Sequence, residues 1–241
     1  MYEDRLYRER MRAEGLVSFK VVVKETDLYI LAATDLSKLA LEVVINHRHR
    51  LENYISRQPE FLTSFVPVRL LPGAPDVAVR MAEAADIAGV GPMAAVAGTF
   101  AEIVGEALLK ESPQVIVENG GDIYIKTSVP RIIELYAGDS PLSGKVGLNI
   151  KPGDTPLGVC TSSGKVGPSI SLGVAHAACV VARSAALADA AASAVGNAVS
   201  REGDVQAALD VSTTITGVLG AVVISGGVIG ARGMIELVKI G

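Results

Sequence analysis

Apolar and polar positions alternate along several short stretches of this chain. Between residues 17 and 23 the larger apolar side chains are Phe19, Val21 and Val23, and a second apolar run follows at 28–32. The polar Lys-Glu-Thr segment between these runs predicts a β-hairpin. Further β-rich runs are bounded by Gly, Pro or polar residues, and they predict strands at 66–70, 115–117, 123–125, 132–136, 146–150, 158–161, 177–181, 214–224 and 234–240.

Helical periodicity occupies the segments between these runs. Asp35 is placed to cap a helix at 36–56, and further helices are expected at 76–88, 93–110 and 204–209. Residues 2–14 are charged and predict an exposed helix or arm. Because strands and helices do not alternate in a regular βαβ order, the pattern predicts one α+β domain spanning 1–241 with mostly antiparallel strands.

The segment 184–197 has the strongest helical signal. Seven of its fourteen residues are alanine, and Asp189 is its only charge. Alanine is the best helix former, Ser184 is a suitable N-cap, and Gly196 and Asn197 can end the helix. With no bulky anchor, we expect this helix to be largely buried, closely packed and intolerant of larger side chains.

Composition narrows the class of protein further. The chain has 241 residues, of which 49% are hydrophobic and only 4% aromatic, with no Trp. Its core must therefore consist of Val, Ile, Leu and Ala. A net charge of −4 argues against a nucleic-acid or anionic-membrane partner. No apolar stretch predicts a signal peptide or a membrane span, so we expect a cytoplasmic protein that forms a homodimer through an apolar face.

Asp189 is the first residue with candidate chemistry. Ser193 lies four positions later, so both side chains share one helix face. A lone carboxylate on an apolar helix is costly to bury unless something satisfies it. A metal ion with a polar ligand would do so, and so would a backbone N–H or an arginine.

A second candidate is the turn Glu118-Asn119-Gly120-Gly121-Asp122 between two expected strands. Such a turn exposes backbone N–H groups that can cradle a phosphate or approach a planar ring. The same residues also suit an ordinary hairpin, because Asn-Gly is among the commonest turn dipeptides.

A third candidate is the hydroxyl-rich strand end at 158–164, which includes Cys160. Hydroxyls at a strand end suit phosphate or ribose contacts. Cys160 reads either as a nucleophile or redox thiol or as a structural thiol, and reactivity requires Lys165 or His176 beside it. Cys160 and Cys179 are both expected to be unpaired. The Gly-rich segment 89–98 opens a helix, where an anion could bind.

Taken in order, these motifs resemble the ApbE-like superfamily, whose best-known members are FAD:protein FMN transferases. The motifs are Ala97-Gly98 at a helix start, Gly120-Gly121-Asp122, Thr161-Ser162-Ser163-Gly164, and Asp189 with Ser193. The resemblance covers 89–197, whereas 1–88 diverges and 198–241 forms a C-terminal hairpin region. Length and the Cys-Thr-Ser-Ser-Gly run are most similar to the short, uncharacterised cytosolic branch of the superfamily.

The resemblance implies two antiparallel sheets with packed helices, of the tunnelling-fold type. It also implies Mg²⁺ held by Asp189, Ser193 and the carbonyl of Ala97, with Asp189 serving catalysis. FAD or FMN would lie in a cleft lined by two groups of residues, Asn119, Gly120, Gly121 and Asp122 together with Thr161, Ser162, Ser163 and Gly164.

The chain departs from the transferase pattern at three places. Ala97 replaces the usual Lys, Ser193 replaces a Thr, and His176 is not part of a His-x-x-Asp-Pro element. Three functions therefore stay open. They are a Mg²⁺-dependent enzyme of FMN transfer or FAD pyrophosphate cleavage, a sulfur-handling protein of anaerobic metabolism that uses Cys160, and a non-catalytic module that binds a nucleotide or flavin.

Overall fold

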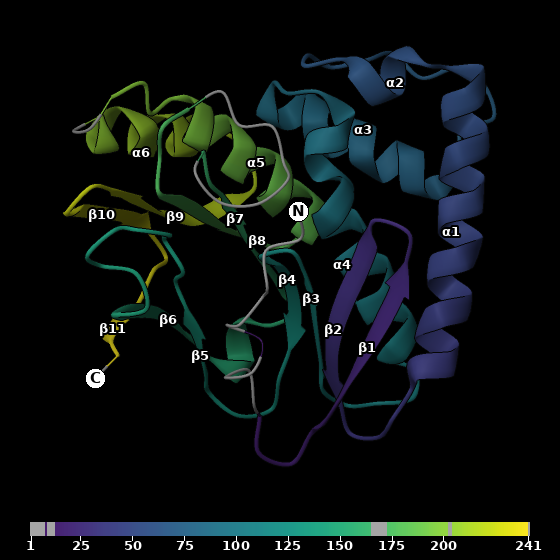
Figure 1. Ribbon diagram of the computed structural model, residues 1–241, viewed down its shortest axis with the longest axis horizontal. Coiled ribbons are helices and arrows are strands. Elements are labelled where there is room, and N and C mark those ends of the chain that lie inside the picture. Colours follow the sequence, from purple (N-terminus) through teal and green to yellow (C-terminus); the bar gives the residue numbers. More distant parts are fainter. Residues whose placement is uncertain (1–7, 9–12, 165–172, 202–203, 241) are drawn as a thin grey trace.

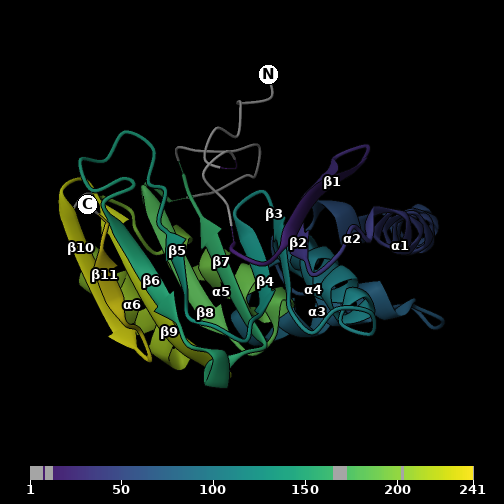
Figure 2. The same cartoon turned by 90° about the horizontal axis from the view of Figure 1, so that it is seen from below.

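The computed structural model describes residues 8, 13–164, 173–201 and 204–240. Its centre is an eight-stranded sheet in the order β1-β2-β3-β4-β7-β8-β9-β10, in which every neighbouring pair is antiparallel. Helices cover one face of this sheet, and a smaller antiparallel sheet, β11-β6-β5, covers part of the other (Figure 1, Figure 2). The predicted α+β class with two antiparallel sheets and packed helices is confirmed.

The strands of the large sheet are β1 (Val17–Val23), β2 (Thr26–Ala32), β3 (Val115–Asn119), β4 (Asp122–Lys126), β7 (Leu157–Ser162), β8 (Ala177–Ala182), β9 (Val218–Ser225) and β10 (Val228–Gly233). The small sheet contains β5 (Arg131–Glu134), β6 (Val146–Ile150) and β11 (Leu237–Lys239). The helices are α1 (Ser37–Arg57), α2 (Glu60–Thr63), α3 (Asp76–Ala88), η2 (Pro92–Ala95), α4 (Val96–Leu108), η3 (Pro152–Asp154), α5 (Ala185–Asn197) and α6 (Val205–Thr214).

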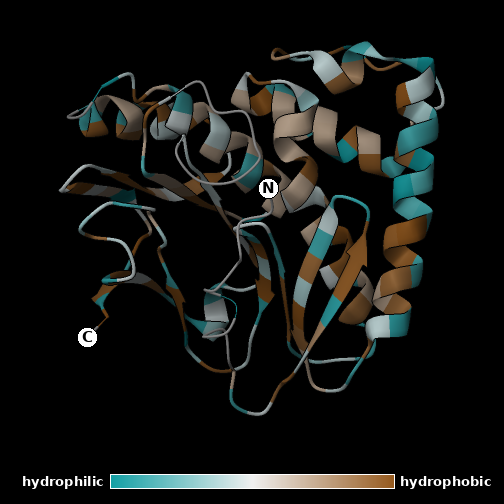
Figure 3. Cartoon of the chain, viewed as in Figure 1, coloured by the Kyte–Doolittle hydropathy of each residue, from teal (hydrophilic) through white to brown (hydrophobic). Residues whose placement is uncertain are grey.

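Two apolar cores lie on opposite faces of the large sheet. Because successive side chains of a strand point to opposite faces, Tyr124 and Cys160 belong to the core beneath the helices. Ile125 and Val159 belong to the core shared with the small sheet. Polar residues gather in the C-terminal half of α1, whereas its N-terminal half and most of α4 are apolar (Figure 3).

Most of the expected elements are present, but the expected strand at 66–70 is wrong. The chain forms the short helix α2 just before it, and 66–70 makes no ladder. Pro59 occupies the N-cap position of α2, where its missing N–H costs nothing. The extended residues after α2 have no neighbouring strand to pair with, so their β propensity is not expressed.

The C-terminal region also differs from the expectation. Residue 214 belongs to α6 rather than to a strand, and β9 begins only at Val218. After β9 the chain turns at Gly226-Gly227 and forms β10, a strand that the pattern missed. The β propensity of that segment is low because it contains Gly230, Arg232 and Gly233.

The Gly-rich segment 89–98 connects α3 to α4. Gly89 is the left-handed C-cap of α3, with a φ of 70°. The helix expected at 93–110 begins as the 3₁₀ turn η2 and continues as α4. Within the described residues, no single helix combines the length and apolar character that crossing a membrane requires. The segments Asp76–Ala88 and Pro92–Leu108 pass that test only as a pair, across a 105° bend.

The Ala-rich helix α5 is buried as expected. Ser184 is its N-cap and accepts a hydrogen bond from the Leu187 N–H at 3.3 Å. The carboxylate of Glu102 on α4 also accepts hydrogen bonds from the N–H groups of Ala185 and Ala186, at 2.5 and 3.0 Å. This second cap comes from 83 residues away and was not predictable from the helix alone.

Ala190→Leu is expected to lower the free energy of unfolding by roughly 1–3 kcal/mol through overpacking. Ala190 has no exposed surface, so the added methyl groups must displace neighbours. Urea denaturation followed by circular dichroism measures the change. An unchanged urea midpoint would contradict the close packing of Ala190 in the structure.

Candidate functional site

The first part of the site is the hairpin that joins β3 to β4. Gly120 and Gly121 both have positive φ, 70° and 104°, as the tight turn requires. Asn119 and Asp122 face each other across the hairpin and share the face that the helices cover. The Asn119 amide donates to the Ala97 carbonyl at 3.1 Å, and the Thr161 N–H donates to Asp122 at 3.3 Å. The turn is thereby fixed to α4 and to β7.

The second part is Asp189 on α5. One of its carboxylate oxygens accepts a hydrogen bond from the Gly98 N–H at 2.8 Å. Gly98 is needed here, because a Cβ on it would lie 2.1 Å from the Ala185 carbonyl oxygen and 2.7 Å from the Asp189 Cβ. Asp189 thus caps the start of α4, while Glu102 caps the start of α5. The Gly98 N–H therefore offsets part of the cost of burying the Asp189 carboxylate. A backbone N–H was one of the alternatives to a metal ion that the sequence left open.

Two neighbouring carboxylates dominate the electrostatics of this region. Burial raises the pKa of Asp122 well above its usual range, and the negative charges of Asp189 and Glu118 raise it further. Burial also raises the pKa of Asp189 to about 7, although N–H groups of Gly98 and Ala97 act in the opposite direction. Asp189 keeps some solvent contact. A cation between the two groups would relieve this cost.

The donor set around these carboxylates fits a hard divalent cation. It offers the carboxylates of Asp122 and Asp189 and the carbonyl of Ala97. Ser193 lies four residues after Asp189 on α5, about one turn further along the helix. Oxygen ligands of this kind suit Mg²⁺, which keeps several waters and substrate phosphates. Among the described residues there is no cluster of three or more His, Cys, Asp or Glu side chains arranged for a metal.

The expected nucleotide-binding strand end is only partly directed at this region. Ser162 is close to α5, because a Cβ on Gly196 would lie 3.4 Å from its hydroxyl oxygen. The Thr161 side chain points to the other face of the sheet, where it forms a hydrogen bond with the Cys179 thiol. Of Thr161, only the backbone N–H reaches Asp122, whereas the Cys160 side chain also forms a hydrogen bond with Asp122. The N–H of Gly164 already donates to the Ala175 carbonyl at 3.0 Å, while Ser163 is partly exposed.

A buried ion network behind the turn was missed at the sequence level. Glu118 accepts hydrogen bonds from the Gly121 N–H at 2.8 Å and from Arg8 at 2.6 Å. Arg8 also pairs with Asp27 at 2.7 Å. The expected exposed arm at 2–14 is therefore wrong at Arg8, which is buried, and most of that segment lies outside the described residues. Glu118 and Arg8 are 110 residues apart, so no local pattern connects them.

The surroundings of Cys160 disfavour a nucleophilic thiolate. The thiol is fully buried and its sulfur lies 3.4 Å from the Ala185 carbonyl oxygen. Burial and the neighbouring carboxylates raise the pKa of Cys160 well above its usual value. Of the two residues expected to activate it, Lys165 lies outside the described residues. His176 is engaged elsewhere, with Gly226 at 3.0 Å and Asp139 at 3.2 Å.

Both cysteines are free and buried, as expected. We expect neither thiol to react with iodoacetamide in the native protein at pH 8. Burial raises the pKa of Cys179 to about 12, so the reactive thiolate is scarce until the pH approaches that value. Mass spectrometry should detect two modifications after denaturation and none before. Rapid labelling of Cys160 by iodoacetamide in the native protein would instead support the hypothesis of a sulfur-handling protein.

Solved structures with the same fold are known. An ApbE protein from Thermotoga maritima superposes with a TM-score of 0.56 at 13% identity, covering 91% of this chain and 97% of that one. The flavin transferase ApbE from Vibrio cholerae also gives a TM-score of 0.56, at 12% identity, covering 90% of this chain and 97% of that one. The class of fold is therefore ApbE-like.

Sequence comparison then identifies the family. The model of the AbpE bacteria family matches residues 8–227, so the chain belongs to this family within the ApbE-like superfamily. A UPF0280 protein of Methanopyrus kandleri is 46% identical over 225 residues, 90% of this chain and 91% of that protein. A UPF0280 protein of Methanocella arvoryzae is 42% identical over 208 residues, 86% and 84% of the two chains.

Proposed function

We propose that this protein binds a flavin nucleotide together with Mg²⁺ and acts on the pyrophosphate of FAD. The observation that carries the proposal is the buried pair of carboxylates, Asp122 and Asp189, held between a glycine turn and two helix ends. Two solved structures of the same fold are described as flavin transferases, which supports a flavin as the ligand.

In this proposal each part of the site has a separate task. Asp189, Asp122, Ser193 and the Ala97 carbonyl would hold Mg²⁺, which when bound neutralises charge on the phosphates. Asn119 fixes the orientation of that carbonyl through its hydrogen bond. Gly120 and Gly121 have no side chains, so a planar ring can approach the turn closely. Ser162 offers a hydroxyl to a phosphate oxygen.

The reaction follows from the chemistry of a pyrophosphate. An oxygen nucleophile forms a bond to the phosphorus of the FMN half, the bridging P–O bond breaks, and AMP leaves with the bridging oxygen. Water as the nucleophile gives FMN and AMP, whereas a protein hydroxyl gives a flavinylated target and AMP. The proton of the nucleophile passes to solvent or to a carboxylate of the site.

Titration of FAD with and without Mg²⁺ tests the proposal, with flavin fluorescence for binding and chromatography of FMN and AMP for turnover. Binding that requires Mg²⁺, followed by release of AMP, supports the enzyme. Mg²⁺-dependent binding with no product identifies a non-catalytic module instead. Failure of FAD, FMN and ATP to bind with Mg²⁺ contradicts both.

The homodimer and the cytoplasmic location also belong to this proposal. Large apolar side chains such as Phe65 and Val66, which follow α2, are exposed and would be covered by a second copy. Light scattering of the purified protein should give twice the mass of 24.9 kDa. A monomer at micromolar concentration would remove this part of the proposal.

A further inference from the structure

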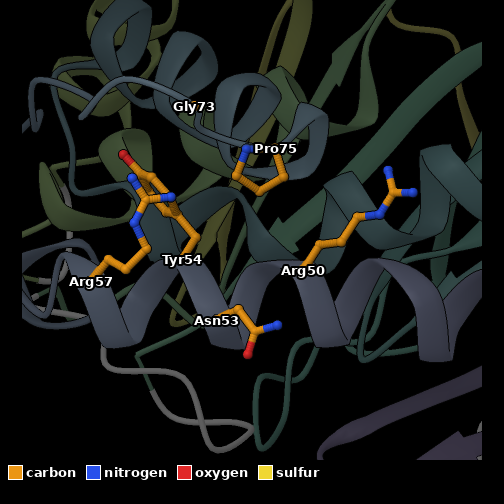
Figure 4. Close-up of a pocket in the computed structure, with 6 residues that line it drawn as sticks. All are labelled: Arg50, Asn53, Tyr54, Arg57, Gly73 and Pro75. Carbon is orange, nitrogen blue, oxygen red and sulfur yellow. The ribbon is translucent and has the colours of Figure 1, made fainter.

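A second hollow lies on the outer side of the helical layer, between α1 and the loop before α3. Its volume is about 200 Å³, and it is lined by Arg50, Asn53, Tyr54, Arg57, Gly73 and Pro75. Figure 4 shows the two arginines on the same helix, on either side of Pro75. None of these residues belongs to the Asp122 and Asp189 site.

The side chains of Arg50 and Arg57 give this hollow its positive charge. Arg50 and Arg57 form no ion pair with any residue that the structure describes. Asp76, which follows Pro75 directly, is paired with Arg80 at 3.0 Å. The whole chain has a net charge of −4. The two arginines therefore give this hollow a charge of the opposite sign to that of the chain.

Arg57 is held in place rather than left to move in solvent. One of its terminal nitrogens donates to the Pro72 carbonyl at 3.0 Å, and its guanidinium carbon lies 6.0 Å from the centre of the Tyr54 ring. Its other terminal nitrogen lies beside Gly73, 4.0 Å from where a Cβ would be. The Arg57 fork is thus oriented by the protein before any ligand arrives.

The N-terminus of α3 adds to the positive electrostatic potential of the hollow. Pro75 is the N-cap of this 13-residue helix, and no side chain caps its first N–H groups. The positive end of the helix dipole therefore lies at the wall of the hollow. The pKa of His47, one turn before Arg50, is lowered by burial and then by Arg50, which is consistent with a positive local field.

We propose that this hollow is an anion site that binds the terminal phosphate group of a small molecule. A phosphate monoester carries close to two negative charges at neutral pH and matches two arginines, whereas a single carboxylate matches one. The volume accommodates a phosphate group with a small organic part attached. In the absence of a metal, the carboxylate pair of the first site repels the same anion.

Inorganic phosphate is the probe for the test, titrated by calorimetry into the full chain in EDTA at low ionic strength. Wild-type protein is expected to bind one phosphate, and the double variant Arg50→Gln/Arg57→Gln to bind it at least about tenfold more weakly. Lys38→Gln, which removes an exposed cation from the same helix, should bind like wild type. Because both arginines are exposed at the surface, the double variant should keep the wild-type circular dichroism spectrum.

Three results would show that the hollow is not a specific anion site. They are the absence of saturable binding by wild type, equal affinity in the double variant, and an equal loss in Lys38→Gln, which would indicate general attraction by surface charge. Succinate at the same ionic strength tests the ligand class. Binding of succinate as tight as that of phosphate would contradict the assignment to phosphate.

Discussion

Asp189→Asn is expected to stabilise the metal-free protein while removing its Mg²⁺-dependent binding of nucleotide. Asparagine keeps the shape and an oxygen that accepts the Gly98 N–H, but it removes a negative charge from beside Asp122. We expect a gain of roughly 0.5–2 kcal/mol in the free energy of unfolding. The affinity for FAD with Mg²⁺ should fall by at least about tenfold, because a metal ligand is lost.

The pH dependence gives this prediction a definite sign. The pKa of Asp189 is about 7 in the folded protein, whereas an unfolded aspartate titrates near pH 4. Between these values the folded state holds a proton that the unfolded state has lost. The stability of metal-free wild type should therefore fall as the pH rises from about 4 through about 7. Asp189→Asn should show a flatter profile.

Urea denaturation at several pH values between 5 and 8, in EDTA, measures this difference. Asp86→Asn is the matched control, because Asp86 is exposed on α3 and the substitution makes the same change of charge. Addition of Mg²⁺ should restore stability to wild type at pH 8 and have no such effect on Asp189→Asn. Parallel pH profiles for wild type and both variants would contradict the raised pKa of Asp189 in the folded protein.

Gly98→Ala is expected to lower the free energy of unfolding by about 3 kcal/mol. The added Cβ would lie 2.1 Å from a carbonyl oxygen of α5, so a backbone would have to move. Since the same contact aligns the Gly98 N–H with Asp189, the substitution should also weaken binding of Mg²⁺ and FAD. The effect is therefore expected on both stability and binding, in contrast to that of Asp189→Asn.

Gly153→Ala is the control for this substitution. A Cβ at Gly153 has no neighbour within 4 Å, and the residue does not need positive φ. We expect its effect to stay within roughly 0.5 kcal/mol. A Gly98→Ala protein with the melting temperature of wild type would mean that α4 and α5 lie further apart than in the structure.

The parts of the site with local signatures were predictable from the sequence. Asn119-Gly120-Gly121 has the composition of a tight hairpin turn, and the alanines around Asp189 predict a buried helix whatever the rest of the chain does. That the two meet at Ala97 and Gly98 followed only from the resemblance to the ApbE-like superfamily. Periodicity within each segment contains no information about that meeting.

Other features depended on distant parts of the chain or on the choice of sheet face. The alternation in β7 separates Thr161 from its neighbours Cys160 and Ser162, but only the packing shows which face the helices cover. The contacts from Arg8 to Glu118 and from Glu102 to Ala185 span 110 and 83 residues. Such pairs bring charges together through the tertiary fold, and no spacing rule connects them.

Strand alternation in the β3–β4 hairpin has a consequence for how this site tolerates changes in length. Glu118 faces Arg8 on one side of the sheet, while Asn119 faces Ala97 on the other. Inserting or deleting one residue within β3 would exchange these faces and place a charged carboxylate under the helices. A two-residue change would restore the faces. Length variants of this hairpin that keep activity should therefore differ by even numbers of residues.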